Sequence, residues 1–356
     1  MGLGVELGLT GVRTAQRSML TIGHNITNAN TDGYSRQDVR LTTETPIIGH
    51  NGTEGQGVKL DRIERSTAEF INSRLLEKQS AFSGDDAFNI RLRDLEGVFN
   101  EPSDFGIKNA MAGFADAVQE FSKNPENNAV RIQMLERAKT MTNRFNLMAS
   151  DINSMTANAR EDIKTAVSEV NILTSRVADL NGKIVALTIS GLAAHDLEDQ
   201  RDIALTDLSK LIDVSVKFSG DGISKTVTFG GRELVFGANF LALTTNTTPN
   251  GDLELVFKSD STLASATGGK LKGLIDFQSS ARTTKGRIDT LVSSIVDQFN
   301  RIHSEGIGTK GGFSSITGKN GVSNAGATLN TAGLLPFTAS SGDLFVTVTN
   351  TVTGDV

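Results

Sequence analysis

The first 29 residues carry apolar side chains at steps of three, four and seven positions, the spacing of one face of an α-helix. The positions on this face are Val5, Leu9, Val12, Met19, Ile22, Ile26 and Ala29. The pattern ends in the segment NANTDGYS, where Asn residues and the Asp32–Gly33 pair favour a turn. We therefore expect an amphipathic helix over residues 5–29, followed by a turn.

This helix needs a packing partner. An isolated helix of about 25 residues is marginal in water and gains its stability chiefly by packing its apolar face. The residues for which we expect a partner are Val5, Leu9, Val12, Met19, Ile22 and Ile26. The partner is either another helix of this chain or a neighbouring molecule. The strand-like segments QDVRLTT (37–43) and GVKL (57–60), on either side of a Gly-rich loop, are too short to form a domain.

Capping signals divide the next segment into helices. Ser66 and Glu69 have the spacing of a capping box, and apolar positions continue at helical spacing to Phe99. A second stripe covers residues 107–121. Asn124–Pro125 then has the composition of an N-cap followed by proline at the first helical position.

The longest regular pattern lies at 145–187. Residues at one position of a heptad are Phe145, Ile152, Ala159, Ala166, Leu173, Leu180 and Leu187. Four residues after each of the first six are Ala149, Thr156, Ile163, Val170, Val177 and Ile184. Such a repeat predicts a coiled-coil-like helix about 65 Å long that packs against helices at 70–121 and 271–302.

β-Rich runs separate the helices in the second half. After a short helix at 196–212, segments rich in Val, Thr, Leu and Phe predict a small β-sheet at 214–257, with Asn250–Gly251 as a hairpin turn. From residue 306 the composition changes to Gly, Ser, Thr and Asn, and the chain ends in the strand-like LFVTVTN.

The predicted fold class is mainly α with inserted β. We expect an N-terminal helix with a connecting loop at 1–65 and an elongated helical domain at 66–305 that includes the small sheet. Residues 306–356 are expected to begin a β-rich outer domain that is truncated here, so we interpret the sequence as a fragment.

Composition excludes several classes of protein. The chain has no Cys, so it has no disulfides or thiolate metal sites. A formal charge of −6 argues against binding a phosphate backbone, and no apolar run approaches the length of a membrane span. The N-terminal residues lack the basic start of a signal peptide. We therefore expect either a cytoplasmic protein or export by another route, with no nucleic acid and no membrane insertion.

Catalytic and metal-binding patterns are also missing from the sequence. His24, His50, His195 and His303 show no metal-type spacing. The acidic segment DLEDQRD (196–202) would place Asp199 and Asp202 on one helix face, where salt bridging with Arg201 or solvation is commoner than a catalytic pair. The Gly-rich segments match neither a P-loop nor a dinucleotide-binding fingerprint. We expect a protein that is not an enzyme and has no metal or cofactor.

The segment NITNANTDGYSRQ (25–37) resembles the signature shared by flagellar rod, hook and hook-associated axial proteins, and its last part resembles the FlgK family in particular. The residues that carry the resemblance are Asn25, Asn28, Asn30, Thr31, Gly33, Tyr34, Ser35, Arg36 and Gln37. Further similar segments follow in the family's order at 55–66, 95–131, 197–216 and 268–277.

The resemblance implies a secreted structural subunit of the bacterial flagellum that serves flagellum assembly and motility. Such a protein passes through the type III export apparatus and forms a ring at the hook–filament junction. It also implies that the N-terminal helix is an axial helix that pairs with a C-terminal helix, which these residues do not contain. The implied partners are further copies of itself, the hook protein, the second hook–filament junction protein, the export apparatus and a chaperone.

Three alternatives stay open at this point. The chain is another axial protein such as the hook or distal rod protein, an exported adhesin-like protein with an axial N-terminus, or a hydrolase embedded in a filament protein. For the residues of segment 25–37 our hypothesis is that they set the angle between the N-terminal helix and the outer domain, whereas the alternative is an ordinary turn.

Overall fold

The structure is a computed structural model that describes residues 3–49, 52–99, 106–305, 324 and 326–327. The chain forms two compact units. The first unit consists of Met1–Asp116 and Leu135–Ile288, and the second of Ala117–Met134 and Asp289–Val356. The domain boundaries predicted at 65/66 and 305/306 remain predictions. The β-rich segment predicted at 306–356 lies almost wholly outside the described residues.

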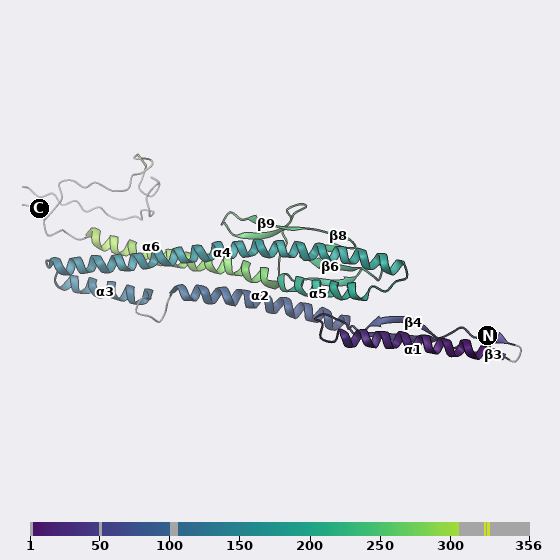
Figure 1. Cartoon of the computed structure of the whole chain (residues 1–356). Helices are drawn as coiled ribbons and strands as arrows, with labels where there is room; N and C mark the ends of the chain where they lie inside the picture. Colours follow the sequence, from purple (N-terminus) through teal and green to yellow (C-terminus); the bar gives the residue numbers. More distant parts are fainter. Residues whose placement is uncertain (1–2, 50–51, 100–105, 306–323, 325, 328–356) are drawn as a thin grey trace, which may run out of the picture. The chain divides into compact units, whose positions relative to one another are not determined.

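Helices dominate the described residues, which confirms the mainly α fold with inserted β-strands (Figure 1). The helices are α1 (Leu3–Thr27), α2 (Glu69–Phe99), α3 (Ile107–Lys123), α4 (Asn128–Ile189), α5 (His195–Leu211) and α6 (Gly269–Glu305). Within the first unit, α2 and α5 lie side by side, and α4 runs alongside them.

The first strands form hairpins close to α1. Strand β1 (Gln37–Thr43) pairs antiparallel with β4 (Val58–Arg65), and the register shifts between Arg40 and Leu41. Strands β2 (Ile47–Gly49) and β3 (Gly52–Glu54) lie between β1 and β4 in the sequence and form a second antiparallel pair.

The later strands form two sheets, where the sequence predicted one. Strands β5 (Ser215–Phe218), β6 (Lys225–Phe229), β7 (Arg232–Phe236) and β8 (Asn239–Phe240) form an antiparallel sheet in that order. Strands β9 (Leu243–Thr247) and β10 (Leu253–Phe257) form a separate pair, joined through the predicted turn, where Gly251 has a φ of 82°. The run FLALTT is divided because the Leu241 N–H donates to β7, whereas the Ala242 carbonyl accepts from Lys258 beyond β10.

The heptad face of α4 is the buried face, as predicted. Its fully buried or nearly fully buried members are Phe145, Ile152, Ala159, Ile163, Ala166, Val170, Val177, Leu180 and Ile184. In the middle of the first unit this face joins a core with Leu205 and Leu208 of α5, Phe229 of β6 and Leu271 of α6. The predicted partner helix at 271–302 therefore contributes to the same core as the heptads.

Two predicted helix starts are wrong. Helix α4 begins at Asn128, and the Asn127 side chain caps it by accepting a 2.9 Å hydrogen bond from the Ala129 N–H. Asn124–Pro125 belongs to the preceding turn. Helix α2 begins at Glu69, three residues after Ser66, and the Glu69 carboxylate contacts the Lys225 amine at 3.3 Å. An ion pair with a distant strand therefore replaces the local capping box.

Candidate functional site

Helix α1 turns its polar face toward the β1–β4 hairpin. Thr14 and Thr21 are the buried residues of this helix, with 6% and 7% of their surface exposed. The Thr14 hydroxyl donates to the Thr10 carbonyl at 2.8 Å and lies 3.5 Å from the Val58 carbonyl on β4. A Cβ on Gly57 would collide with the Thr10 side chain, so the hairpin approaches this face closely.

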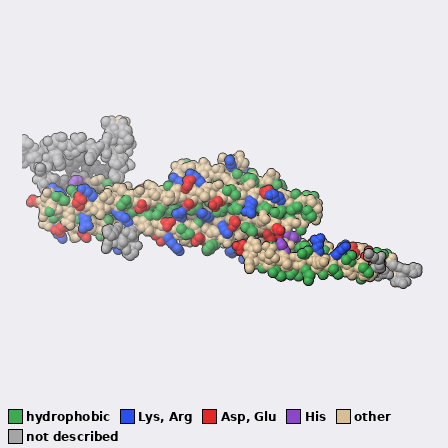
Figure 2. Space-filling view, in the orientation of Figure 1, with side chains coloured by type: hydrophobic (Ala, Val, Ile, Leu, Met, Phe, Trp, Pro, Cys, Tyr) green, Lys and Arg blue, Asp and Glu red, His purple; other side chains and the backbone are tan. Residues whose placement is uncertain are grey.

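The apolar stripe of α1 therefore lies on the opposite face, in solvent. Its members Val5, Leu9, Val12, Met19, Ile22 and Ile26 are between 44% and 74% exposed. Figure 2 shows hydrophobic side chains gathered along one edge of this helix. The arrangement is the reverse of an ordinary surface helix, which buries its apolar stripe and exposes its polar face.

The Asn25 side chain holds the turn that follows α1 in place through hydrogen bonds. The Asn25 side-chain oxygen accepts hydrogen bonds from the Gln37 N–H at 2.9 Å and from the Tyr34 hydroxyl at 2.7 Å. Its amide group donates to the Gln37 carbonyl at 2.8 Å. His24 adds an edge-on ring contact and a 2.9 Å hydrogen bond with the Tyr34 hydroxyl. These contacts tie the last turn of α1 to the first residue of β1.

Gly33 and Ser35 bring this segment against α5. Gly33 has a φ of +76°, a conformation that L side chains rarely adopt, and a Cβ there would collide with Ile203. Two residues later the Ser35 N–H donates to the Asp199 carboxylate at 3.1 Å. The backbone of the signature thus makes both steric and polar contact with the helix of the DLEDQRD segment.

Arg65, the last residue of β4, is the main electrostatic link between the hairpin and α5. Its guanidinium lies 2.6 Å from the Asp199 carboxylate, 2.7 Å from Asp202 and 3.3 Å from Glu198, and its side chain is only 8% exposed. Burial lowers the pKa of Arg65, but the hydrogen bond to Asp202 and the surrounding carboxylates raise it above its ordinary value. Arg65 stays charged and is bound by three acids.

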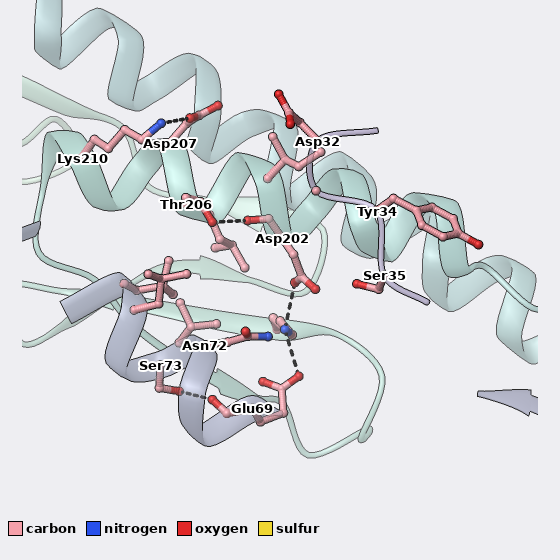
Figure 3. Close-up of a pocket in the computed structure, with 17 residues that line it drawn as sticks. Asp32, Tyr34, Ser35, Glu69, Asn72, Ser73, Asp202, Thr206, Asp207 and Lys210 are labelled. Atoms are coloured by element: carbon pink, nitrogen blue, oxygen red, sulfur yellow. Dashed lines mark hydrogen bonds and ion pairs between the residues drawn. The ribbon is translucent and has the colours of Figure 1, made fainter. Parts of the chain in front are cut away.

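Lys225 of β6 extends this network to α2. Its side chain is 4% exposed, and its amine lies 3.0 Å from Asp202 and 3.3 Å from Glu69. Lys225 is one of the residues that line a cavity of about 520 Å³. Figure 3 shows Asp202 and Glu69, its two acidic partners, in the lining of this cavity. Asp32 and Gly33, the N-terminal part of α2, α5 and strands β5 and β6 line the cavity.

Arg201 faces the opposite side of α5, into the protein. Its guanidinium donates to the Asn181 side chain of α4 at 3.0 Å and to the Ile223 carbonyl at 3.1 Å. Asn181 in turn bonds both the N–H and the carbonyl of Lys225. The expected pairing of Arg201 with Asp199 and Asp202 is thus replaced by pairing of these acids with Arg65 and Lys225. Asp199 and Asp202 do share one face of the helix, as the sequence suggested.

His195 completes the contact at the start of α5. Its Nε2 lies 2.9 Å from the Ile63 carbonyl, and its Nδ1 lies 3.3 Å from the Glu198 carboxylate. The hydrogen bond with Glu198 raises the pKa of His195, and the same bond lowers the pKa of Glu198. The charged imidazole donates from both ring nitrogens, one to each of these acceptors.

The structure does not bring all signature residues into one place. Asn25, Tyr34 and Gln37 meet one another, and Gly33 and Ser35 meet α5. Asn28 and Thr31 bond each other and the end of α1, Arg36 pairs with Asp38 on the surface, and Asn30 is exposed. We name the contact region made by Gly33, Ser35, Arg65 and the acidic face of α5 the arm joint.

Sequence reasoning missed Arg65, Lys225, His195 and Ile203. The sequence did indicate that Asp199 and Asp202 have a basic partner, because two acids three residues apart on a partly buried helix face need a cation to offset their charge. Nothing local in the sequence indicated that the cations come from positions 65 and 225.

The charged groups of the arm joint are paired with one another. Every acid of the arm joint is paired with a cation or donor, and among the described residues no cluster of three or more His, Asp or Glu could hold a metal. Among the same residues, no helix is both long and apolar enough to cross a membrane.

Comparison with known proteins gives a consistent result. A family model described as "Flagellar hook-associated protein FlgK helical domain" matches residues 92–319. Flagellar hook-associated protein 1 of Bacillus subtilis is 29% identical over 62% of the chain and 45% of its own length. The protein of the same name from Salmonella typhimurium is 26% identical over 86% of the chain and 57% of its own length. The chain thus spans about half the length of the curated relatives it matches.

A solved structure adds a likeness in fold. The flagellar hook junction protein FlgK from Burkholderia pseudomallei superposes with a TM-score of 0.50 at 23% identity, over 60% of this chain and 39% of that one. The family model covers well over half of the sequence. The chain belongs to the FlgK family of flagellar hook-associated proteins.

Proposed function

We propose that this chain is a non-catalytic structural subunit of the bacterial flagellum, exported by the flagellar type III apparatus and assembled at the junction of hook and filament. The observation that carries the proposal is the reversed packing of α1, which buries Thr14 and Thr21 and exposes Val5, Met19 and Ile26. An exposed apolar face of this length is characteristic of a surface that another molecule covers.

The stripe is the proposed assembly interface. Membership of the FlgK family supports a partner in the flagellar axis: further copies of this chain, the hook protein or the second junction protein. Association buries the apolar face, and each exposed Leu, Ile or Met that becomes fully buried contributes about 1.5–3 kcal/mol. The mechanism is non-covalent packing of amphipathic helices around an axis.

The arm joint is proposed to fix the direction in which α1 leaves the helical domain. Gly33 allows close approach to Ile203, and Arg65 connects the end of β4 to α5 through three carboxylates. Ion pairs of Arg65 and the hydrogen bond from the Ser35 N–H to Asp199 join the two sides of this region. Directional contacts define an angle more sharply than a non-directional apolar surface does.

Complementation tests the function. A flagellated strain that lacks its junction protein receives this chain, alone or extended by the C-terminal segment of a relative, and hooks and filaments are counted by electron microscopy. We expect filaments from the extended version. Export of both versions without any filaments would contradict the junction role.

The same strain tests the stripe. In the extended version, a Val12→Ser and Ile22→Ser double variant should be exported but should not restore filaments. Its matched control, Arg13→Ser and Arg17→Ser, changes exposed polar positions of the same helix and should restore them. Equal filament numbers from the two variants would exclude the stripe as the assembly interface.

A further inference from the structure

Two Asp–Gly pairs in the chain form a matched comparison. They are Asp32–Gly33, in the turn after α1, and Asp221–Gly222, in the turn between β5 and β6. Both pairs are exposed, and the two glycines have φ values of +76° and +67°. Glycine has no side chain to hinder its own nitrogen, so an Asp–Gly bond is the place where a backbone nitrogen most easily attacks the preceding carboxyl group. The pairs therefore differ mainly in the hydrogen bonds that hold them.

The reaction open to such a pair is an isomerisation that needs no enzyme and no oxidant. The glycine nitrogen attacks Cγ of the protonated aspartate, the new N–Cγ bond closes a five-membered imide, and the amide hydrogen and the carboxyl hydroxyl leave as water. Water then adds to one of the two imide carbonyls. Addition at the side-chain carbonyl restores aspartate, whereas addition at the main-chain carbonyl gives isoaspartate, in which the chain runs through Cβ and Cγ. The product has an unchanged mass and one more carbon atom in its backbone.

Hydrogen bonds hold the Asp221–Gly222 pair back from this reaction. The Asp221 carboxylate accepts from the Ile223 N–H at 2.8 Å, the Ser224 N–H at 2.9 Å and the Ser224 hydroxyl at 2.6 Å. The bond from the Ser224 hydroxyl lowers the pKa of Asp221 and so favours the charged carboxylate, which does not lose its oxygen as water. The Gly222 N–H donates to the Ser219 carbonyl at 2.9 Å. Both reacting groups therefore have partners that they must give up before the ring closes.

Neither reacting group of Asp32–Gly33 has such a partner. Among the described residues, the Asp32 carboxylate makes no hydrogen bond or ion pair, and the Gly33 N–H has no acceptor. Figure 3 shows Asp32 in the lining of the cavity, with no interaction drawn to it. The turn is closed one residue later, where the Tyr34 N–H donates to the Thr31 carbonyl at 3.1 Å. The fold thus places this pair in a turn and leaves both of its groups free to react.

The product would form within the arm joint. Gly33 lies so close to Ile203 that a Cβ would collide, and the Ser35 N–H donates to Asp199 at 3.1 Å. An extra backbone carbon just before Gly33 disturbs both contacts. We propose that Asp32 is a site of spontaneous isomerisation to isoaspartate, and that the modified chain has a loosened arm joint. The inference does not depend on the proposed function, because it concerns the isolated chain.

Peptide mapping of aged protein tests the site. The chain is kept for several weeks at physiological temperature and mildly acidic pH, and trypsin then releases the peptides Ser18–Arg36 and Phe218–Lys225. Each peptide contains a single acidic residue, Asp32 or Asp221, so a new chromatographic peak of unchanged mass reports isomerisation there. Deamidation of Asn raises the mass and is counted separately. In the folded chain we expect Asp32 to isomerise about ten-fold faster than Asp221, because one or two hydrogen bonds must break before Asp221 reacts.

Unfolded protein and two variants provide the controls. In guanidinium chloride the turns are lost, and the two pairs should isomerise at similar rates. Ser224→Ala removes one hydrogen bond from Asp221 and should speed isomerisation there about two- to five-fold without changing Asp32. Asp32→Glu should give no product of unchanged mass in its peptide, because the longer side chain would have to close a six-membered ring. Equal rates at Asp32 and Asp221 in the folded chain would overturn the assignment.

Tyr34 provides a test of the effect on the arm joint. It is the single Tyr of a chain without Trp, and its hydroxyl donates to Asn25 at 2.7 Å, so its emission reports on this turn. In aged protein this emission should change in proportion to the isomerised fraction, and hydrogen exchange in β1 should accelerate. Aged Asp32→Glu protein should match fresh protein in both measurements. Isomerised protein with unchanged emission and exchange would overturn the loosening of the joint. Neither outcome bears on complementation, which tests the junction role separately.

Discussion

Helices α1 and α4 carry the same kind of apolar pattern but use it in opposite ways. On α4 the heptad residues face inward, and Ile163, Val170 and Val177 have no exposed surface. On α1 the stripe faces solvent, and the buried positions are the threonines at 14 and 21. Periodicity therefore shows that a helix has an apolar face to bury, but not whether the partner lies in the same chain. Whether the apolar face packs within the chain depends on which residues lie on the other face of the helix.

The opposite face of α1 is suited to a close backbone neighbour. Thr10, Thr14 and Thr21 are small and satisfy their hydroxyls within the helix, so the β1–β4 hairpin packs on them without unpaired donors. The opposite face of α4 carries charged residues, such as the exposed Lys139–Glu136 and Lys164–Glu161 pairs. Of these two helices, α1 is the one that packs its polar face within the chain and leaves its apolar face exposed.

The largest expected effect comes from the buried side of this comparison. Ile163→Ala removes a fully buried heptad side chain and should lower the free energy of unfolding by about 4 kcal/mol. Val12→Ala, on the exposed stripe of α1, should change it by less than about 0.5 kcal/mol. Urea titrations followed by circular dichroism measure both. Equal losses would mean that the α1 stripe is buried within the folded chain.

The second largest loss of stability is expected at the arm joint, where ion pairs join the hairpin to α5. Arg65→Met leaves Asp199, Asp202 and Glu198 without their shared cation and should weaken docking of the hairpin by about 3 kcal/mol. Hydrogen exchange should accelerate in β1 and β4 but not in the middle of α4. Arg40→Met is the matched control, since its pair with Glu64 is exposed to solvent and should contribute little to stability. Faster exchange throughout α4 would contradict a local joint.

Gly33 tests the steric part of the joint. Gly33→Val places a branched side chain at a positive φ and against Ile203, which should cost about 2 kcal/mol. Gly33→Ala in an Ile203→Ala background should be less destabilising, because the collision with the Ile203 side chain is removed. The cost of placing an L residue at this positive φ should remain. In the complementation strain, Gly33→Val should reduce motility. Intact assembly and motility would exclude an angle-setting role for this turn.

The extent to which the sequence predicted the structure follows the range of the interactions. The heptads of α4 and the stripe of α1 depend on neighbours three or four residues apart, so their helices were predicted correctly. The cap at Asn124 was predicted wrongly because Asn127 offers the same chemistry three residues later, and local rules do not choose between them.

The contacts of the arm joint could not be predicted from local sequence rules. Its contacts join Arg65 to residues more than 130 positions away, and Lys225 to Glu69 over 156 positions. Asp199 and Asp202 could be placed on one helix face from sequence, but their partners could not. The separation of β8 from β9 likewise depends on which earlier or later strand each pairs with, and only the fold determines that.

The contribution of the His195–Glu198 pair to the stability of the arm joint should be smaller than the effects above. It should also be confined to a limited range of pH. The pKa of His195 is raised above 6.5, so its contribution is fully present below pH 6.5 and is lost as pH rises through the folded-state pKa. The pKa of Glu198 is lowered below 4.5, so its contribution is present above pH 4.5 and is lost as pH falls. Burial and the positive charge of Arg65 act against the charged imidazole.

His195→Gln should therefore destabilise the protein most between about pH 4.5 and 6.5, and less at pH 8. Unfolding free energies of this variant and the parent, measured across that range, give the difference curve. A Glu198→Gln background should remove the window, because the imidazole then has no carboxylate to stabilise its charge. A difference that grows above pH 7 would contradict the assigned pairing.

The smallest effect on stability should come from the residues that matter most for assembly. Met19→Ser and Ile26→Ser replace side chains that are 74% and 72% exposed, so together they should change the unfolding free energy by less than about 1 kcal/mol. The same pair should abolish filament restoration in the complementation strain, since the lost apolar area lies in the proposed interface. Thr14→Ala with Thr21→Ala is the reverse control, because it changes the hairpin face and leaves the stripe intact. If the serine pair unfolds the chain, the stripe packs in cis, and α1 and α4 use their patterns alike.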